Sequence, residues 1–429
     1  MARRRAPTDE DYCSFCYKSA REVNRLLAGP AGINICDECV QLCSDIIHSE
    51  KVMHAGARGV AAGKRTLSPR NIRERLDEHI IGHDETKKFV SVAVYNHYQR
   101  IQHNYSPAKS EVELEKSNIL LLGDTGTGKT LLARTLAQIV DVPFAMADAT
   151  TLTEAGYVGE DVENILLKLI QAAGGDLPRA EKGIVYIDEI DKISRKSENR
   201  SITRDVSGEG VQQALLKIVE GTMANVPPQG GRKHPEQQML RIDTSNILFI
   251  CGGAFDGLEP IVSRRLGTRQ IGFISREARE IHQREVLKHV EPDDLVKYGI
   301  IPELVGRLPI ACVLDKLSKA DFFRILQEPR NAIISQFTKQ YELIGVELSF
   351  TADFLKKVVD ESYEKKMGVR ALRSTLEKYM TPLTYDVASG PRKPRKLVVN
   401  CDLIEWGPEA FLQQAMAEKP AGEKLTEAG

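Results

Sequence analysis

The segment 123–130 most constrains the fold, because Gly-Asp-Thr-Gly-Thr-Gly-Lys-Thr matches a phosphate-binding loop. Its glycines let backbone N–H groups turn toward phosphates, and the following helix N-terminus adds partial positive charge. Lys129 is expected to reach the β- and γ-phosphates of ATP, and Thr130 to complete a Mg²⁺ shell. An apolar strand at 118–122 precedes the loop, which argues against a chance glycine turn. The predicted nucleotide contacts are Gly123, Asp124, Thr125, Gly126, Thr127, Gly128, Lys129, Thr130 and Leu131.

Two carboxylates follow a second apolar run, about 60 residues beyond Lys129. Residues 184–187 read Ile-Val-Tyr-Ile and lead directly into Asp188 and Glu189. An isolated Asp-Glu pair is typical of a solvated strand end, so the buried strand and the spacing carry the interpretation. Asp188 is expected to hold Mg²⁺ through its water shell, and Glu189 to polarise the attacking water as general base.

Apolar periodicity in the middle of the chain predicts the fold class. Residues 184–187 and 247–250 are short β-branched runs typical of buried central strands. One face of the helix after the loop is predicted from Leu131, Leu132, Leu136, Ile139 and Val140. A second helix is predicted from Val162, Ile165, Leu166, Leu169, Ile170 and Ala173. Strands alternating with helices predict an α/β fold, with a parallel sheet covered by helices on both faces.

Two pairs of cysteines near the N-terminus have the spacing of a metal site. Cys13 and Cys16 form one C-x₂-C pair, and Cys36 and Cys39 form a second pair 19 residues later. Four thiolates complete a tetrahedral Zn²⁺ shell, so the ion would be structural. A disulfide pair and a redox pair are the alternatives. The other cysteines, Cys43, Cys251, Cys312 and Cys401, are interpreted as ordinary thiols.

Composition narrows the classes of partner. The chain has 429 residues, is 28% charged and carries a net charge of -1, which disfavours a dedicated nucleic-acid binder. The basic residues 3–5 are not followed by an apolar stretch, so no secretory signal is expected. Apolar runs are far shorter than the roughly 20 residues that span a bilayer. A cytoplasmic location is therefore the default expectation.

The chain is expected to contain about three domains at roughly 150 residues each. Past about residue 315 the pattern becomes mainly helical. The predicted ranges are a zinc-binding domain at 1–52, a flexible linker at 53–66, a large α/β domain at 67–316, a small helical domain at 317–418 and a disordered tail at 419–429.

The loop, the Asp-Glu strand, the paired cysteines and the helical C-terminal block together resemble the ClpX family, the AAA+ unfoldases of the Clp protease. The resemblance spans nearly the whole chain. It implies an AAA+ large domain with a small helical domain, and ATP, Mg²⁺ and structural Zn²⁺ as cofactors. It also implies a homo-hexamer that works with the ClpP peptidase, adaptor proteins and unfolded or tagged substrates, with no nucleic acid and no membrane.

Several loops of the chain resemble the family's substrate-gripping and docking loops. Tyr157 and Val158 lie between two glycines, as in the first pore loop, although such a tyrosine alone would more often pack on a neighbouring surface. Arg204 lies in a segment that resembles the second pore loop. The basic cluster Arg232, Lys233 and His234 resembles the loop at the pore entrance, and the tripeptide Ile271, Gly272 and Phe273 resembles the one that docks into apolar clefts on ClpP. A solvated loop tip and a buried loop anchor are the respective alternatives.

The resemblance also assigns nucleotide-sensing residues. Arg307 aligns with the arginine finger that reaches a neighbour's γ-phosphate, and Arg370 with the small-domain arginine that senses nucleotide in its own subunit. Ile80 and Ile81 align with the apolar pair that packs on adenine. His83 stands where the family commonly has Gln, a departure without a sequence-based interpretation.

The strand predicted at 247–250 runs into Cys-Gly-Gly, without the Asn or Thr that many AAA+ proteins use as a γ-phosphate sensor. No residue is therefore assigned to that role. The function predicted is an ATP-driven unfoldase that threads tagged proteins through a hexameric pore to ClpP and has no peptidase activity of its own. The alternatives are a remodelling chaperone without a peptidase and, less favoured, a nucleic-acid motor.

Overall fold

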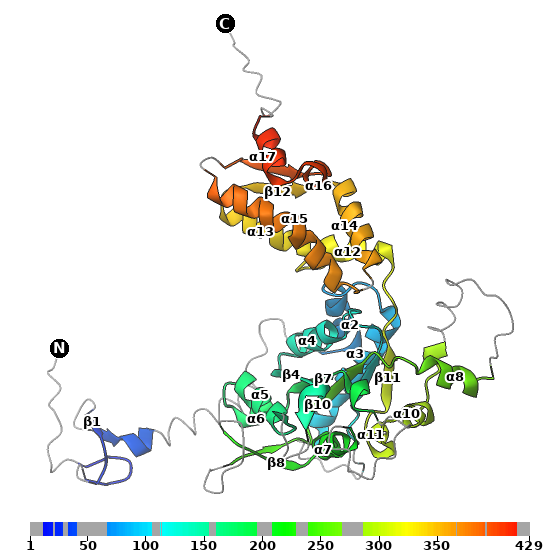
Figure 1. Ribbon diagram of the computed structural model, residues 1–429. Coiled ribbons are helices and arrows are strands. Elements are labelled where there is room, and N and C mark those ends of the chain that lie inside the picture. The colour runs from blue at the N-terminus through cyan, green and yellow to red at the C-terminus, as the bar shows by residue number, and fades with distance from the viewer. Residues whose placement is uncertain are drawn as a thin grey trace. The chain divides into compact units, whose positions relative to one another are not determined.

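The computed structural model describes residues 12–19, 22–28, 33–40, 67–104, 112, 114–153, 160–194, 208–228, 239–267, 286–365, 367–390 and 393–417. The chain forms two compact units, residues 1–66 and 67–429 (Figure 1). The expected linker at 53–66 and the expected tail at 419–429 lie outside the described residues.

The first unit is built on a short antiparallel hairpin. Strands β1 (Leu26–Ala28) and β2 (Asn34–Cys36) pair with Leu26 opposite Cys36. In the parts of this unit that the structure describes, the buried cluster consists of three cysteines and one leucine: Cys13, Leu26, Cys36 and Cys39. So small an apolar core cannot offset the chain entropy lost on folding, which leaves the cysteines as the main source of stability.

A five-stranded parallel sheet forms the centre of the second unit, in the order β11-β3-β10-β7-β4. Its strands are β3 (Ile119–Leu122), β4 (Phe144–Asp148), β7 (Ile184–Asp188), β10 (Leu248–Gly253) and β11 (Ile310–Val313). The helices around it are α2 (Pro69–Asp77), α3 (Asp84–Asn104), α4 (Lys129–Val140), α5 (Asn164–Ala172), α6 (Leu177–Ala180), α7 (Glu209–Glu220), α8 (Glu259–Arg265), α10 (Pro292–Tyr298) and α11 (Pro302–Gly306). Shorter elements are β5 (Leu152–Thr153), β6 (Glu160–Asp161), two 3₁₀ turns, η2 (Ala149–Thr151) and η3 (Ile190–Ile193), and a hairpin of β8 (Met223–Val226) and β9 (Leu240–Asp243).

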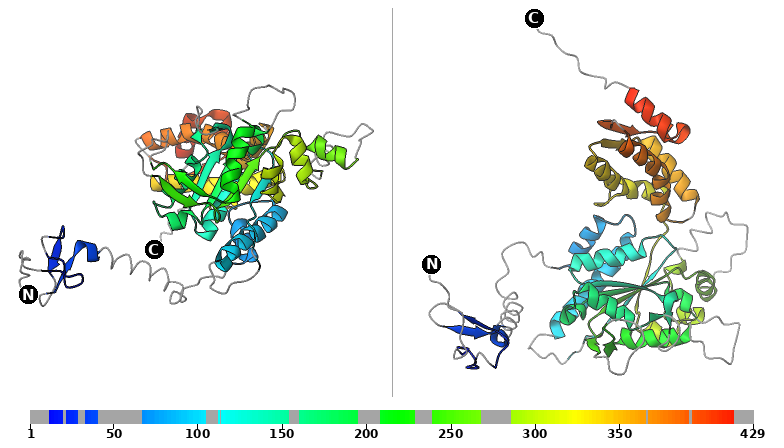
Figure 2. Two further views of the ribbon diagram at one scale, coloured as in Figure 1. Left: turned by 90° about the horizontal axis from the view of Figure 1, so that it is seen from below. Right: turned by 60° about the vertical axis from the view of Figure 1, so that its left-hand side comes forward.

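Helices cover both faces of this sheet, as expected (Figure 2). Alternate residues of a strand point to opposite faces. Ile119 and Leu121 of β3 accordingly pack with α2, α3 and α4, whereas Leu120 and Leu122 pack with α5 and α7. The predicted α/β class is thus confirmed. Within the described ranges, no helix is both long enough and apolar enough to cross a bilayer.

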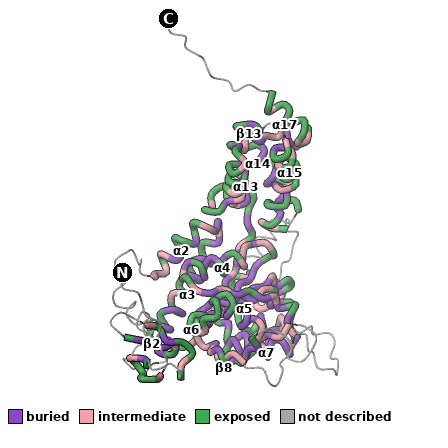
Figure 3. Tube along the Cα trace, turned by 90° about the vertical axis from the view of Figure 1, so that its left-hand side faces the viewer, coloured by how far each residue is buried: buried purple, intermediate pink, exposed green. Residues whose placement is uncertain are grey.

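The small domain is mainly helical, with one short parallel strand pair. Its elements are α12 (Lys319–Gln327), α13 (Ile333–Leu343), β12 (Glu347–Phe350), α14 (Ala352–Glu364), α15 (Arg370–Ser389), β13 (Lys396–Val399), α16 (Asp402–Trp406) and α17 (Pro408–Ala417). Tyr341, Phe354 and Met380 are fully buried in its own separate core. In Figure 3, buried residues follow the strands and the inner sides of the helices in both domains of this unit.

Three details differ from the sequence-based expectations. Leu131 was expected on the apolar face of α4, but it is 50% exposed because the buried stripe follows Leu132, Leu136 and Ile139, and a neighbouring residue lies 100° away around the helix. Val162 is buried but precedes α5 rather than belonging to it. Strand β10 continues through the two glycines at 252–253 instead of ending at residue 250.

Candidate functional site

A cavity of about 350 Å³ opens at the carboxyl ends of the central strands. It is lined by Thr125, Gly126, Gly128, Lys129, Thr130 and Leu131, by Asp188, Glu189, Asp191 and Lys192, by Gly253 and Ala254, and by Ile333, Val369, Arg370 and Arg373 of the small domain. Four residues predicted from distant motifs, Lys129, Asp188, Glu189 and Arg370, thus line one cavity. The edge at which parallel strands end is where open α/β sheets bind ligands.

The glycine loop is folded as a cradle around its own lysine. Gly126 and Gly128 have φ of +82° and +99°, values that residues other than glycine rarely adopt. The Lys129 ammonium donates to the carbonyls of Gly123 (2.5 Å) and Asp124 (3.0 Å). Burial lowers the pKa of Lys129 below its usual value. Because these carbonyls are neutral acceptors, phosphate oxygens would bind this buried cation more strongly.

The side chains expected around Mg²⁺ meet at the start of α4 and the end of β7. The Thr130 hydroxyl donates to Asp188 Oδ2 at 3.2 Å. The other carboxylate oxygen, Oδ1, accepts from the Tyr186 hydroxyl at 2.9 Å and from the Glu189 N–H at 3.0 Å. A hydroxyl and an anchored carboxylate, adjacent and facing a phosphate loop, are the oxygen donors that Mg²⁺ takes alongside nucleotide phosphates. The residues present therefore fit the cofactor.

Tyr186 is a residue of this site that sequence reasoning missed, because it was taken only as part of an apolar run. The ring is fully buried, and its hydroxyl has room only because residue 252 is glycine. A Cβ at Gly252 would lie 2.3 Å from the Tyr186 oxygen. Gly252, near the end of β10 where many AAA+ proteins have a polar sensor, thus makes space for the tyrosine that orients Asp188.

Replacing Tyr186 by Phe should weaken Mg²⁺-dependent nucleotide binding with little effect on Mg²⁺-free binding. One hydrogen bond to a charged group contributes about 1.5–3 kcal/mol, so we expect the Mg²⁺ concentration for half-maximal binding to rise about 10-fold or more. Titration of a fluorescent ATP analogue with Mg²⁺ measures this shift. Tyr98→Phe is the control, because the buried Tyr98 hydroxyl also makes one hydrogen bond, to the Lys182 carbonyl, away from the cavity. Equal shifts in both variants would contradict the assignment.

Glu189 lines the cavity with an unusual backbone. Its φ is +55° and its ψ is +34°, the left-handed region, at the turn between β7 and η3. Non-glycine residues in this region carry strain, which persists where the surrounding structure determines it, and such residues gather at functional sites. The turn directs the chain out of the strand immediately beside Asp188.

Asp191 is a second residue that the sequence analysis missed. The carboxylate is 2% exposed, and its Oδ1 accepts from the Ala254 N–H at 3.2 Å. Lys192 Nζ lies 3.0 Å from Oδ2. A Cβ at Gly253 would lie 2.5 Å from Asp191 Oδ1, so this glycine too is required by a side chain from η3. Its position three residues after Asp188, one 3₁₀ turn further on, was the available signal.

The glycine loop and the small domain approach each other through their backbones. The Val369 N–H donates to the Gly126 carbonyl at 3.2 Å. A Cβ at Gly126 would lie 2.7 Å from the Met367 carbonyl oxygen, and one at Gly368, whose φ is +64°, would lie 2.8 Å from the Gly126 Cα. Two glycines therefore permit this contact, which places the start of α15, with Arg370, at the cavity.

Ile80 and Ile81 are buried but are not among the residues that line the cavity, so their adenine role stays a prediction. The nearby His83, at φ +57°, contacts the glycine loop: its Nε2 lies 3.0 Å from the Thr127 carbonyl. A carbonyl only accepts, so Nε2 carries the proton, and burial lowers the pKa of His83 below its usual value. A Gln amide can donate to the same carbonyl, so His83 can make the hydrogen bond that the Gln common in the family would make at this position.

Arg307 does not line this cavity. It caps the C-terminus of α11, its side chain is 51% exposed, and its guanidinium pairs with Glu220 at 3.0 Å. Arg307 precedes β11, whose residue Ile310 pairs with Ile119 at the start of β3. It therefore lies at the amino edge of the sheet, whereas the phosphate loop lies at the carboxyl edge.

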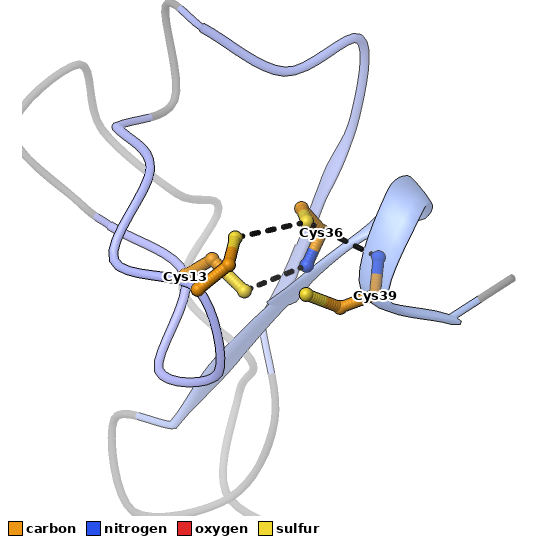
Figure 4. Close-up of side chains that lie close together, drawn as sticks. Cys13, Cys36 and Cys39 are labelled. Atoms are coloured by element: carbon orange, nitrogen blue, oxygen red, sulfur yellow. Dashed lines mark hydrogen bonds between the residues drawn. The ribbon is translucent and has the colours of Figure 1, made fainter. Parts of the chain in front are cut away.

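The four predicted metal ligands converge in the first unit. Figure 4 labels three of them, Cys13, Cys36 and Cys39. The sulfur atoms of all four lie within 4.8 Å of one another, and Cys16 and Cys36 are 3.6 Å apart, too far for a disulfide. Backbone N–H groups of Cys36 and Cys39 donate to the sulfurs of Cys13 (3.3 Å) and Cys36 (3.4 Å). Burial and the neighbouring thiols raise the pKa of Cys39. Four clustered thiols cannot all ionise unless a cation compensates, so the set fits Zn²⁺.

The loops predicted to grip substrate and to dock a peptidase lie outside the described residues. These are Tyr157, Val158, Arg204, Arg232, Lys233, His234, Ile271, Gly272 and Phe273.

Three family models match separate parts of this chain. A family model described as ClpX C4-type zinc finger matches residues 11–49, one described as AAA domain (Cdc48 subfamily) matches residues 114–311, and one described as the C-terminal, D2-small domain of ClpB protein matches residues 317–394. The ATP-dependent Clp protease ATP-binding subunit ClpX of Treponema denticola is 55% identical over 395 residues, which cover 91% of this chain and 93% of that protein.

Proposed function

This chain belongs to the ClpX family of ATP-binding Clp protease subunits, and we propose that it uses ATP hydrolysis to unfold tagged proteins and deliver them to the ClpP peptidase. The observation that carries this proposal is the single cavity that collects Lys129, Asp188, Glu189 and Arg370 from two domains. A site closed by two domains can change their relative position when its nucleotide is hydrolysed, which is how chemistry becomes mechanical work.

The chain's own residues divide the chemistry among them. Lys129 would neutralise phosphate charge, and Thr130 and Asp188 would hold Mg²⁺, which would supply further charge neutralisation. Tyr186 fixes the Asp188 carboxylate through its hydroxyl. Glu189 takes a proton from the attacking water. Arg370, which belongs to the small domain, senses the bound nucleotide. The contact between Gly126 and Gly368 transmits a change in the phosphate loop to α15.

We further propose a homo-hexameric ring in which Arg307 completes a neighbour's site. Its position at the sheet edge opposite its own phosphate loop supports a role in trans. A charge supplied across an interface stabilises the transition state only in the assembled ring.

The loops that would handle substrate are assigned because their sequences resemble the substrate-gripping and docking loops of the family. Tyr157 and Val158 would grip an extended polypeptide by apolar contact, Arg204 and the basic cluster 232–234 would face the pore, and residues 271–273 would dock on ClpP. The zinc-binding domain, 1–52, would contact adaptors and substrates. Cysteines that are free wherever the structure describes them agree with a reducing, cytoplasmic location.

Deleting residues 271–273 should leave ATPase activity intact and abolish degradation by added ClpP. The tripeptide is assigned to docking by resemblance, and the residues assigned to ATP hydrolysis lie elsewhere in the sequence, so the two activities should separate. The ATPase rate and the release of peptides from a tagged substrate are measured in parallel, with deletion of residues 391–393 as control. Unchanged degradation by the first deletion would refute the docking role.

ATPase stimulation separates this proposal from its two alternatives. We expect unfolded protein, and not DNA, to raise the rate, because the net charge of -1 offers no general basic surface for nucleic acid. Stimulation by DNA alone would favour a nucleic-acid motor. Stimulation by protein without any coupling to ClpP would favour a chaperone that works without a peptidase.

A further inference from the structure

Asn118, which directly precedes β3, is a buried amide bonded to three separate elements. It is 1% exposed. Its Nδ2 donates to the Arg307 carbonyl at 2.9 Å and to the Val219 carbonyl, near the end of α7, at 3.5 Å. Its Oδ1 accepts from the Phe249 N–H of β10 at 3.2 Å. A buried amide whose donors and acceptor are all used by backbone groups fixes those groups in position.

The hydrogen bond from Asn118 holds the backbone of Arg307 and not its side chain. The guanidinium is exposed and pairs with Glu220 at the surface, where an ion pair contributes little stability. The backbone of Arg307 is held by the turn of α11, where its N–H donates to the Leu304 carbonyl, and by Asn118. Because this surface ion pair is weak, the reach of the side chain across an interface depends on where its backbone is fixed.

Strand β3 places Asn118 and the phosphate loop at its two ends. The strand runs from Ile119 to Leu122 and is followed by Gly123, the first residue of the loop. At about 3.3 Å per residue, roughly 15 Å separate the two ends. The strand is buried on both faces and paired on both sides, with β10 and β11, so it moves as one rigid piece.

We propose that Asn118 is the positioning residue for Arg307. It links Arg307, which a subunit presents to its neighbour, to β3, the strand that leads into the phosphate loop of the same subunit. The inference rests on the proposed action of Arg307 in trans. A shift of β3 on nucleotide binding moves Asn118, and with it the Arg307 carbonyl. Nucleotide binding at one site thereby changes the position of the arginine finger at the next site around the ring. An amide that only fills the core would have no such effect on a neighbour.

The test is complementation between two subunits with different defects. Asn118→Ala removes the anchor and leaves the subunit's own cavity intact, whereas Glu189→Gln removes hydrolysis and leaves Arg307 intact. Alone, Asn118→Ala should bind nucleotide normally and lose ATPase activity about 10- to 100-fold, the scale of a misplaced catalytic group. In an equal mixture, about a quarter of interfaces pair an intact site with an intact finger, and activity should rise toward that fraction of wild type.

Two further variants keep the result interpretable. Asn118→Asp retains an acceptor for Phe249 and loses the donors to Arg307 and Val219, so it should complement in the same way if the alanine variant does not fold. Thr86→Val is the control: the buried Thr86 hydroxyl donates to the Val313 carbonyl at the other end of β11, at 2.6 Å. This variant should lose some thermal stability and show no gain on mixing.

Mixtures of Arg307→Ala with Glu189→Gln test the trans role of Arg307 separately from the role of Asn118. If that pair does not complement, the proposed trans role of Arg307 is wrong, and the inference fails with it. If that pair complements while neither Asn118 variant does, Arg307 acts in trans without Asn118. Nucleotide affinity that falls in parallel with the activity of Asn118→Asp would likewise assign Asn118 to the core alone.

Discussion

A Glu189→Gln subunit is expected to bind ATP about as tightly as the wild type and to hydrolyse it about 10²–10⁴-fold more slowly, the usual contribution of a general base. Glutamine keeps the size of the side chain but accepts no proton. The anchors of Asp188, the Tyr186 hydroxyl and the residue-189 N–H, remain in place, because the second is a backbone group. Binding and chemistry should therefore separate in this variant.

Equilibrium binding of a fluorescent ATP analogue and single-turnover hydrolysis measure the two effects independently. Glu342→Gln is the control, because Glu342 is an exposed acid of the small domain that pairs with the exposed Lys339 at 2.8 Å and does not line the cavity. Hydrolysis by Glu189→Gln within a few-fold of the wild-type rate would remove Glu189 from the role of base. Lost binding would mean that its left-handed backbone, rather than its carboxylate, is what the site requires.

Replacing Cys36 by Ser is expected to unfold the first unit and to leave nucleotide binding by the second unit unchanged. Zinc binding contributes about 10–16 kcal/mol in comparable small domains, and among the described residues of this unit Leu26 alone joins the cysteines in the buried cluster. The second unit has its own cores, so its cavity does not depend on the metal.

Metal analysis should find one Zn²⁺ per wild-type chain and none in Cys36→Ser, and hydrogen exchange should show protection lost in residues 12–40 alone. Cys401→Ser, at a half-buried free thiol of the small domain, should retain the zinc and the protection. A Cys36→Ser protein that keeps protected amides in the first unit would show that its fold does not depend on the metal.

The parts predictable from sequence are those encoded by contiguous residues. The strand, loop and helix around residues 118–140 form one continuous motif, and each C-x₂-C pair is local. Buried strands were recognisable because a parallel sheet covered on both faces requires uninterrupted apolar runs. Leu131 was misplaced because an apolar residue beside an apolar stripe fits the same period yet faces outward.

The remaining features depend on pairs of residues far apart in the sequence. Tyr186 requires Gly252, and Asp191 requires Gly253, but nothing in either strand alone indicates that the other leaves space. The amide of Asn118 meets Arg307 only after β3 and β11 pair. Such contacts follow from register between strands, which periodicity does not specify.

The most direct test of the unfoldase proposal is the ATP-dependent loss of fluorescence from a folded, tagged reporter, measured with this chain and ClpP. A reporter domain is held by about 5–15 kcal/mol, which repeated ATP-driven pulling can overcome. We predict that fluorescence falls and peptides appear with ATP, that neither occurs with ADP or with Glu189→Gln, and that no peptides form without ClpP. Steady fluorescence in the presence of ATP, active ATPase and ClpP would contradict the account.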